Sequence, residues 1–345
     1  MPNNKQFRWC RMAGLMAVSW FPGAEPPIPL GAVQVVTDPS SQFLYVLDQS
    51  SGLCAYAIDS ASHELTELAG SPFETPDEPT SLAFAKSGSK TFLYVAAGTG
   101  RAAPVNTSIA AYSVDLLGAL VPIAAYAVAG DSSTIVAARN HLYIAGFHTN
   151  SVTAFSIGPS GELSEDVSES PIATDTGPYS IAVDPSGSVL YTANAGARRS
   201  SEGAPGSISA FTIDRSDSSR CALTPVRGNP QPIAVQGPLS IDPTGRFLFA
   251  PEASGVSVYA INTSTGTLTA VAGSPFSAGT YASRSLPGAG RPNEFISIVN
   301  GGPADIPEFT LARNAVLTPL PGSPVPLKTN SCCLTIVSDR LTATP

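Results

Sequence analysis

The chain has 345 residues, of which 43% are hydrophobic and 13% charged, and its formal net charge is −8. This acidic balance, with Arg198-Arg199 as the one adjacent basic pair, excludes a nucleic-acid-binding protein, because phosphate contacts need clustered cations. The hydrophobic share excludes a disordered chain, and 30 glycines with 32 prolines are typical of strands joined by many turns.

Residues 1–27 form an N-terminal segment that matches nothing later in the chain. Three basic residues precede the apolar stretch 12–21, as in a short secretory signal peptide, but residues 22–25 make a poor cleavage site. Two interpretations stay open: an exported protein with a signal peptide, or a cytoplasmic protein with a disordered N-terminus. No later segment is long enough to span a membrane as an apolar helix.

From residue 28 onward one phrase recurs at intervals of roughly 45–60 residues, most clearly at 38–73 and 242–276. It begins with an Asp-led turn and an apolar strand such as Phe-Leu-Tyr-Val. A further strand such as Ala-Tyr-Ala-Ile-Asp follows, and the phrase ends with Leu-Thr and Gly-Ser-Pro-Phe. A period of this size indicates a solenoid, an array or a propeller, in which each unit buries its apolar faces against its neighbours.

The first unit predicts four strands in chain order. Residues 32–36 form a short apolar strand, and 43–47 form a continuous apolar run, typical of a strand buried on both faces. Residues 54–58 form the third strand, and the more polar 65–68 suit an outer edge. Four antiparallel strands in one unit are typical of a β-propeller blade.

The unit recurs along the whole chain. Six full copies occupy residues 31–73, 79–128, 129–172, 177–232, 233–276 and 280–325. Residues 331–337 then match the first strand of another copy. We therefore predict an all-β fold: a β-propeller of four-stranded antiparallel blades over residues 28–345, with six recognisable repeats and a seventh that is partial or lost.

These motifs resemble the seven-bladed β-propeller lactonase family, which includes 6-phosphogluconolactonases and carboxymuconate-lactonizing enzymes. The resemblance covers roughly residues 30–340 and rests on the Asp-Pro-Ser/Thr-Gly turns at 184–187 and 242–245, the Leu-Tyr-Val strands and the Gly-Ser-Pro-Phe phrases. It implies a hydrolase that acts on a small sugar or aromatic lactone, or a sugar acid, by acid–base chemistry without a metal or other cofactor.

The resemblance also implies three places for functional residues. A Pro-His that begins an inner strand corresponds to Pro178-Tyr179 here, and a Gly-Pro-Arg-His corresponds to residues 237–240, where Leu239 and Ser240 replace Arg and His. A Glu after the second strand of that same blade corresponds to Glu252, the candidate general acid or base.

The repeat itself suggests a ring of equivalent positions, three residues after the second-strand aromatic. These positions hold Asp48, Ala97, Gly146, Asn194, Glu252 and Asn300. Four of the six carry a carboxylate or an amide, so the ring could bind a polyol, a sugar acid or a cation through oxygen atoms. Ordinary turn chemistry explains the same residues, because Asp and Asn favour the starts of loops.

Two further side chains are candidates for ligand binding. His148 follows the second strand of the third unit and is predicted on the same loop rim as Glu252. Arg198 lies in the Gly-, Ser- and Ala-rich insert 196–206, which could recruit an anion over the axial opening or could be a plain solvated loop.

No metal site is predicted. The five cysteines, Cys10, Cys54, Cys221, Cys332 and Cys333, fit no zinc spacing. We interpret them as structural or free, with a single disulfide as the alternative.

Three functions remain open at this point. The first is a lactonase-like enzyme with Glu252 as its acid or base. The second is a non-catalytic propeller that binds a ligand or a protein, of unknown identity, through its loop face. The third is a truncated or decayed relative, suggested by the incomplete seventh copy.

Overall fold

A computed structural model describes most of the repeat region. The described ranges are 10–12, 15–17, 32–49, 51–60, 64–98, 107–128, 134–165, 170–196, 206–214, 222–233, 235, 237–253, 255–279, 282–288, 294–300, 305–312 and 316–326. All regular structure in these ranges is β-strand, which confirms the all-β prediction. Among them no helix is long and apolar enough to be a membrane span.

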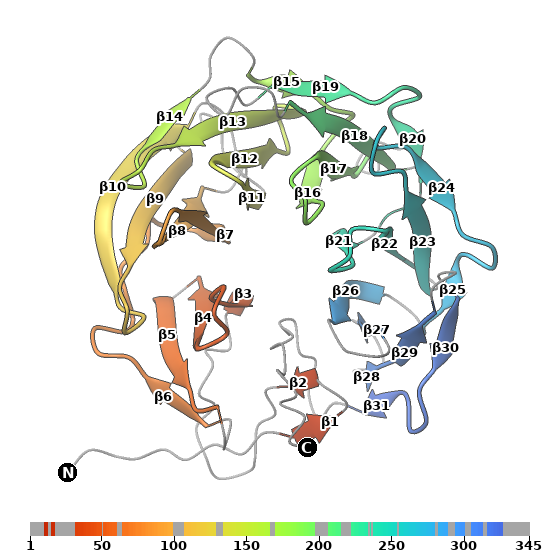
Figure 1. The fold of residues 1–345 in the computed structure, drawn as a ribbon, viewed down its shortest axis with the longest axis horizontal. Helices are drawn as coiled ribbons and strands as arrows, with labels where there is room; N and C mark the ends of the chain where they lie inside the picture. Colours follow the sequence, from red (N-terminus) through yellow and green to blue (C-terminus); the bar gives the residue numbers. More distant parts are fainter. Residues whose placement is uncertain are drawn as a thin grey trace.

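Six antiparallel sheets stand side by side around a ring, with chain order running from the axis outward in each (Figure 1). Blade 1 contains β3 (Ala32–Thr37), β4 (Phe43–Asp48), β5 (Gly52–Ile58) and β6 (Leu65–Glu67). Blade 2 contains β7 (Pro79–Ser87), β8 (Lys90–Ala97), β9 (Thr107–Val114) and β10 (Leu120–Val128). Blade 3 contains β11 (Thr134–Ala138), β12 (His141–Gly146), β13 (Ser151–Ile157), β14 (Leu163–Glu165) and β15 (Ile172–Ala173).

The second half of the ring repeats this plan. Blade 4 contains β16 (Pro178–Val183), β17 (Val189–Asn194), β18 (Ser207–Ile213), β19 (Leu223–Pro225) and β20 (Gln231–Pro232). Blade 5 contains β21 (Ser240–Ile241), β22 (Phe247–Glu252), β23 (Gly255–Ile261), β24 (Leu268–Ala270) and β25 (Phe276–Ser277). Blade 6 contains β26 (Ala282–Gly288), β27 (Glu294–Asn300), β29 (Glu308–Leu311) and β30 (Leu317–Pro319). The short strands β28 (Asp305–Ile306) and β31 (Val325–Pro326) pair with each other.

The six blades match the six predicted repeats. Residues 331–337, predicted to begin a further blade, lie outside the described residues. Within the N-terminal segment, β1 (Cys10–Met12) and β2 (Leu15–Ala17) pair as an antiparallel hairpin. Figure 1 places this hairpin between blade 1 and blade 6. The predicted division of the chain between residues 27 and 28 stays a prediction.

The Asp-led turns form because the aspartate side chain satisfies the backbone of its own loop. Asp38, Asp184 and Asp242 are all buried. In each, Oδ1 accepts a hydrogen bond from the backbone N–H five residues later, at 2.9, 2.7 and 2.6 Å respectively. Oδ2 accepts from the hydroxyl two residues later. The motif therefore closes the hairpin between the first two strands of its blade.

The hydrophobic core lies between blades, because each second strand is buried on both faces. Five clusters of buried side chains each draw on two neighbouring blades. Tyrosines of the second strands also bond across these contacts, because the hydroxyls of Tyr45, Tyr94 and Tyr191 donate to backbone carbonyls of the next blade. The acceptors are the turn glycines Gly118, Gly161 and Gly266, at 2.6, 3.0 and 3.0 Å.

The Gly-Ser-Pro phrase ends the outer strand. In five blades a Ser or Asn before a cis proline accepts a hydrogen bond from a backbone N–H of the third strand. These acceptors are Ser71, Ser170, Asn229, Ser274 and Ser323, at 2.7–3.1 Å from the amides of Ala55, Ala154, Ala210, Val258 and Glu308. The outer strands β6, β14, β19, β24 and β30 accordingly have three residues each, whereas β10 of blade 2, which lacks the phrase, has nine.

Candidate functional site

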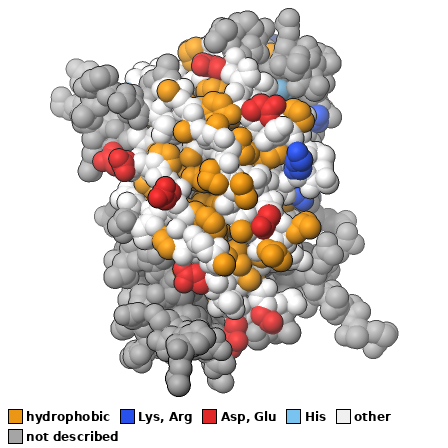
Figure 2. All heavy atoms as spheres, turned by 90° about the vertical axis from the view of Figure 1, so that its left-hand side faces the viewer, with side chains coloured by type: hydrophobic (Ala, Val, Ile, Leu, Met, Phe, Trp, Pro, Cys, Tyr) orange, Lys and Arg blue, Asp and Glu red, His pale blue; other side chains and the backbone are white. Residues whose placement is uncertain are grey.

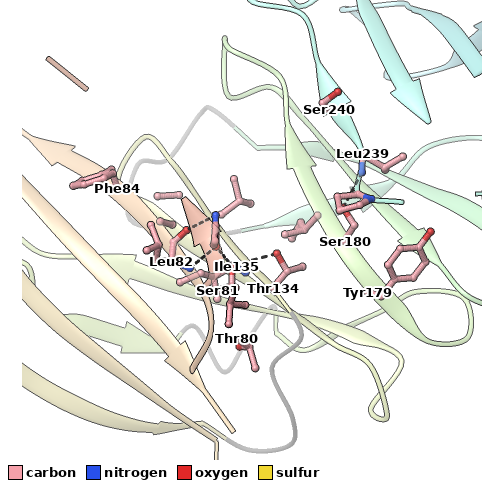
Figure 3. Close-up of a pocket in the computed structure, with 17 residues that line it drawn as sticks. Thr80, Ser81, Leu82, Phe84, Thr134, Ile135, Tyr179, Ser180, Leu239 and Ser240 are labelled. Atoms are coloured by element: carbon pink, nitrogen blue, oxygen red, sulfur yellow. Dashed lines mark hydrogen bonds between the residues drawn. The ribbon is translucent and has the colours of Figure 1, made fainter. Parts of the chain in front are cut away.

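The inner strands of blades 1 to 5 surround an axial pocket of about 480 Å³ (Figure 3). Seventeen of the described residues line it, and none of these seventeen carries a charged side chain. Its polar lining residues are Gln34, Thr80, Ser81, Thr134, Tyr179, Ser180 and Ser240. The remaining lining is apolar, so the pocket combines hydroxyl and amide groups with an aliphatic wall.

Part of this polar lining joins one blade to the next. Gln34, Ser81 and Ser180 occupy equivalent register positions in β3, β7 and β16. Each accepts a hydrogen bond from a backbone N–H of the following blade, and these donors are Leu82 at 2.8 Å, Ile135 at 3.2 Å and Leu239 at 3.0 Å. Buried backbone donors need such partners, so we assign these three side chains to the wall of the ring. We call these three bonds the inner belt.

Two other polar lining residues, Thr80 and Tyr179, sit where their inner strands bulge. β3, β7 and β16 share a one-residue register shift at the same place, and the extra residues are Val33, Thr80 and Tyr179. A bulge re-aims the side chain of its extra residue, and bulges are common beside functional sites. The Tyr179 hydroxyl donates to the Gly237 carbonyl at 3.4 Å and so reaches from blade 4 to blade 5.

Glu252, the candidate acid or base, lies apart from this lining. It ends β22, is half-buried, and accepts a hydrogen bond from the Ser257 hydroxyl of the adjacent strand. It is not among the residues that line the axial pocket. Leu239 and Ser240, which stand where the resemblance implies Arg and His, line the pocket, and Ser240 begins β21, a first strand of only two residues.

The six predicted ring positions are equivalent in the structure. Each one ends the second strand of its blade, at Asp48, Ala97, Gly146, Asn194, Glu252 and Asn300. The side chain of Asn300 lies outside the described parts of the structure. The six residues therefore share one position along their strands, but their side chains differ in direction.

Two of these side chains point into their own blades. Asp48 and Asn194 are wholly buried. Asp48 Oδ1 accepts from both the backbone N–H and the hydroxyl of Ser51, at 2.7 Å. Asn194 Nδ2 donates to the hydroxyls of Ser207 and Ser209 at 3.0 and 2.9 Å. Asp48 thus makes turn hydrogen bonds of the kind that was the alternative to a ligand ring, whereas Asn194 bonds across to side chains of the adjacent strand β18.

His148 is not among the described residues that line the pocket. His148 is exposed in the turn after β12, and its ring packs edge-on against Phe147, with the ring centroids 5.1 Å apart. Arg198 lies outside the described residues. Within the described chain no group of three or more His, Cys, Asp or Glu side chains is placed to hold a metal ion. Cys54 is a buried free thiol whose pKa is raised by that burial.

Gln34 and Thr80 line the pocket although the sequence pattern did not predict them as ligand-binding residues, and Ser240 was expected there only as the replacement of a histidine. All three lie on first strands, whereas the predicted ring of positions lies on the second strands. A polar residue recurs near the start of each apolar inner strand, and aligning those strands would have revealed it.

Residues 35–180 match the family described as "Lactonase, 7-bladed beta-propeller". The resemblance to the seven-bladed lactonase family is confirmed over these residues. Among curated proteins the comparison gave no significant match.

Solved structures of other proteins have the same fold as this chain. A putative 6-phosphogluconolactonase from Bacteroides uniformis is 15% identical with a TM-score of 0.66, covering 87% of this chain and 86% of that chain. The periplasmic gluconolactonase PpgL of Pseudomonas aeruginosa is 17% identical with a TM-score of 0.61, covering 86% and 87%. A functionally unknown protein from Desulfotomaculum acetoxidans is 16% identical with a TM-score of 0.62, covering 87% and 91%. At these identities the likeness concerns the fold alone.

Proposed function

We propose that this lactonase-type propeller binds a small, uncharged, hydroxyl-rich molecule of the sugar or sugar-lactone class in its axial pocket. The observation that carries the proposal is the chemistry of the lining, where hydroxyl and amide groups stand beside aliphatic side chains and none of the seventeen described residues is charged. Hydroxyls both donate and accept hydrogen bonds, so they suit the hydroxyls and ring oxygen of a sugar. The pocket volume of about 480 Å³ suits a ligand of that size.

The same lining argues for neutral over phosphorylated ligands. None of the described lining residues is Lys or Arg, so a phosphate group would lose its hydration there without a counter-charge. Opening a lactone also needs a general base and a donor for the developing oxyanion. The described residues of the lining include no carboxylate and no imidazole. Binding is therefore better supported than turnover.

Lactone hydrolysis remains the second candidate, and one observation favours it. Glu252 is a half-buried carboxylate at the end of β22, where the family resemblance expects the acid or base. A ligand that reaches from the axial pocket toward the loop after β22 would bring its ring oxygen toward that carboxylate.

Calorimetric titration with glucono-1,5-lactone and with 6-phosphogluconolactone tests the binding proposal. We expect the neutral lactone to bind more tightly, and we expect Tyr179→Ala to weaken that binding about tenfold, because it removes both the hydroxyl and the ring from the wall. Thr269→Ala, an exposed change on the outer strand β24, is the control and should bind as the parent does. Tighter binding of the phosphorylated lactone, or no effect of Tyr179→Ala, would contradict the proposal.

A pH-stat assay on the same two lactones tests the second candidate. Glu252→Gln keeps the shape of the side chain and its ability to accept the Ser257 hydrogen bond. If Glu252 is the acid or base, this variant should lose turnover with an almost unchanged melting temperature. Equal turnover in parent and variant would remove Glu252 from that role.

A further inference from the structure

Blade 1 buries both of its faces, although only one of them has a described blade against it. One face packs on blade 2 and belongs to a cluster that the two blades share. The other face forms a sixth cluster from blade 1 residues alone, and its members are Val35, Leu44, Val46, Cys54, Tyr56 and Leu65. Each of these side chains is 7% exposed or less. We call this surface the closing face of blade 1, because it lies on the side of the ring toward blade 6 (Figure 1).

Such low exposure means that another part of the molecule covers the closing face. A sheet face that is open to water leaves its side chains in contact with solvent. The outer rim around β10 shows the contrast, because hydrophobic side chains are open to view there (Figure 2). Leu116, in the turn before β10, is 97% exposed. The burial of the closing face holds within a single chain, so its cover comes from residues of this chain outside the six described blades.

Blade 6 provides the opposite wall of the same space. Glu308 begins β29 and is only 5% exposed. The corresponding residues of four other blades belong to clusters with the following blade, and these are Ala55, Ala154, Ala210 and Val258. Glu308 therefore points into the space after blade 6, whereas the adjacent Phe309 points back to blade 5. Both walls of the space between blade 6 and blade 1 are thus buried.

The β1–β2 hairpin stands in this space. Figure 1 places it between blade 1 and blade 6. Its strands pair antiparallel, with Cys10 opposite Ala17 and Met12 opposite Leu15. A two-stranded hairpin by itself is at best marginally stable in water, so it needs a surface to pack against. The apolar stretch 12–21, which contains β2, matches the apolar closing face of blade 1.

Charge also favours the N-terminal segment as the cover. Residues 1–27 contain three cations and a single acid, whereas the chain as a whole has a formal net charge of −8. The two walls each hold a buried carboxylate, Asp48 on blade 1 and Glu308 on blade 6. Asp48 lies on the closing face, because it is two residues after Val46 on the same strand. Buried carboxylates are stabilised by nearby cations or hydrogen-bond donors, which a basic segment supplies.

We propose that residues 1–27 are a structural part of the ring, in which the β1–β2 hairpin packs on the closing face of blade 1. The apolar stretch 12–21 then serves as a packing surface and not as a leader that is removed. This contact also accounts for the burial of both faces of blade 1, although blade 2 packs against only one of them.

Cys54 is a natural probe of the contact, because its free thiol lies in the closing face. Alkylation by iodoacetamide, read at Cys54 by peptide mass spectrometry, compares the full chain with a variant that lacks residues 2–27. We expect alkylation to be at least about tenfold faster in the variant, with an unchanged circular dichroism spectrum. A synthetic peptide of residues 1–27 with Cys10→Ser, added to the variant, should restore protection. A scrambled peptide of the same composition is the matched control and should not.

Amide hydrogen exchange of the unmodified chain is a second measurement, and it decides the question if the truncated variant fails to fold. Exchange in β1 and β2 should be as slow as in the outer strand β24. Exchange there at the rate of an unstructured peptide would overturn the proposal. Unchanged alkylation of Cys54 in a folded variant would show that other residues cover blade 1, and would also overturn it. So would alkylation of the full chain that slows between about 1 and 100 μM protein, because a second copy would then be the cover.

Discussion

At the scale of single residues, Asn194 illustrates how a repeated position can be correct while its inferred role changes. It ends β17, as its place in the repeat predicts, but its side chain is wholly buried. Its oxygen accepts from Thr192 Oγ1 at 3.1 Å, and its nitrogen donates to two serine hydroxyls. An amide with three such bonds holds strands β17 and β18 together and has little capacity left for a ligand.

Asn194→Ala should therefore lower the free energy of unfolding by about 2–3 kcal/mol, because it leaves several buried hydroxyls short of partners. Asn262→Ala is the control, since Asn262 is exposed and bonds only to backbone N–H groups of its own turn, which water can replace. That variant should lose less than about 1 kcal/mol. Urea denaturation measures both, and equal losses would show that the buried network contributes nothing of its own.

At the scale of strands and blades, stability rests on contacts between neighbours. The tyrosine hydroxyls bond to turn glycines near the rim, the inner belt bonds near the axis, and the hydrophobic clusters lie between them. Gly118 connects two of these features, because its carbonyl accepts from Tyr45 and its backbone approaches Phe43 of blade 1. In a repeat array such nearest-neighbour contacts supply much of the total stability.

Gly118→Ala tests this contact between blades. Gly118 has φ +81°, and an added Cβ would lie 2.5 Å from the Phe43 ring. Gly88 also has a positive φ, +61°, but an added Cβ there would meet nothing within 4 Å. Both alanine variants pay for the left-handed backbone, so Gly118→Ala should be less stable than Gly88→Ala by about 1–3 kcal/mol of overpacking. Thermal unfolding compares the two variants. Equal melting temperatures would show that the close approach of Gly118 to Phe43 does not limit the space at position 118.

At the scale of the whole molecule, the buried second- and third-strand tyrosines link stability to alkaline pH. Burial raises the pKa of the hydroxyls of Tyr45, Tyr56, Tyr94 and Tyr191 well above the usual range. For Tyr45 the neighbouring carboxylates of Asp38 and Asp115 raise it further. The charged phenolate is thus disfavoured in the folded ring relative to the unfolded chain.

The sign of the pH dependence follows. Above the unfolded tyrosine pKa of about 10, the unfolded chain releases protons that the folded ring retains, so stability falls as pH rises. The stability that these buried, neutral tyrosines contribute is fully present below pH 10. Above pH 10 we expect one cooperative unfolding transition. Tyrosinate absorbance at 295 nm and circular dichroism should change together. If these tyrosines ionise while the strands remain folded, burial does not couple their ionisation to unfolding.

The amino-acid sequence by itself determined the repeat, the six blades and their turns, because these depend on local interactions. The Asp242 side chain closes its own hairpin, Ser274 bonds to its own blade, and apolar runs identify strands buried on both faces. Tertiary structure alone decided the axial pocket and the direction of the polar side chains. Thr80 and Ser240 are 160 positions apart in the chain and line the same pocket only because the blades are arranged around one axis. A strand pattern specifies which residues share a position, but the packing of whole blades specifies whether that position faces solvent, a ligand or a neighbour.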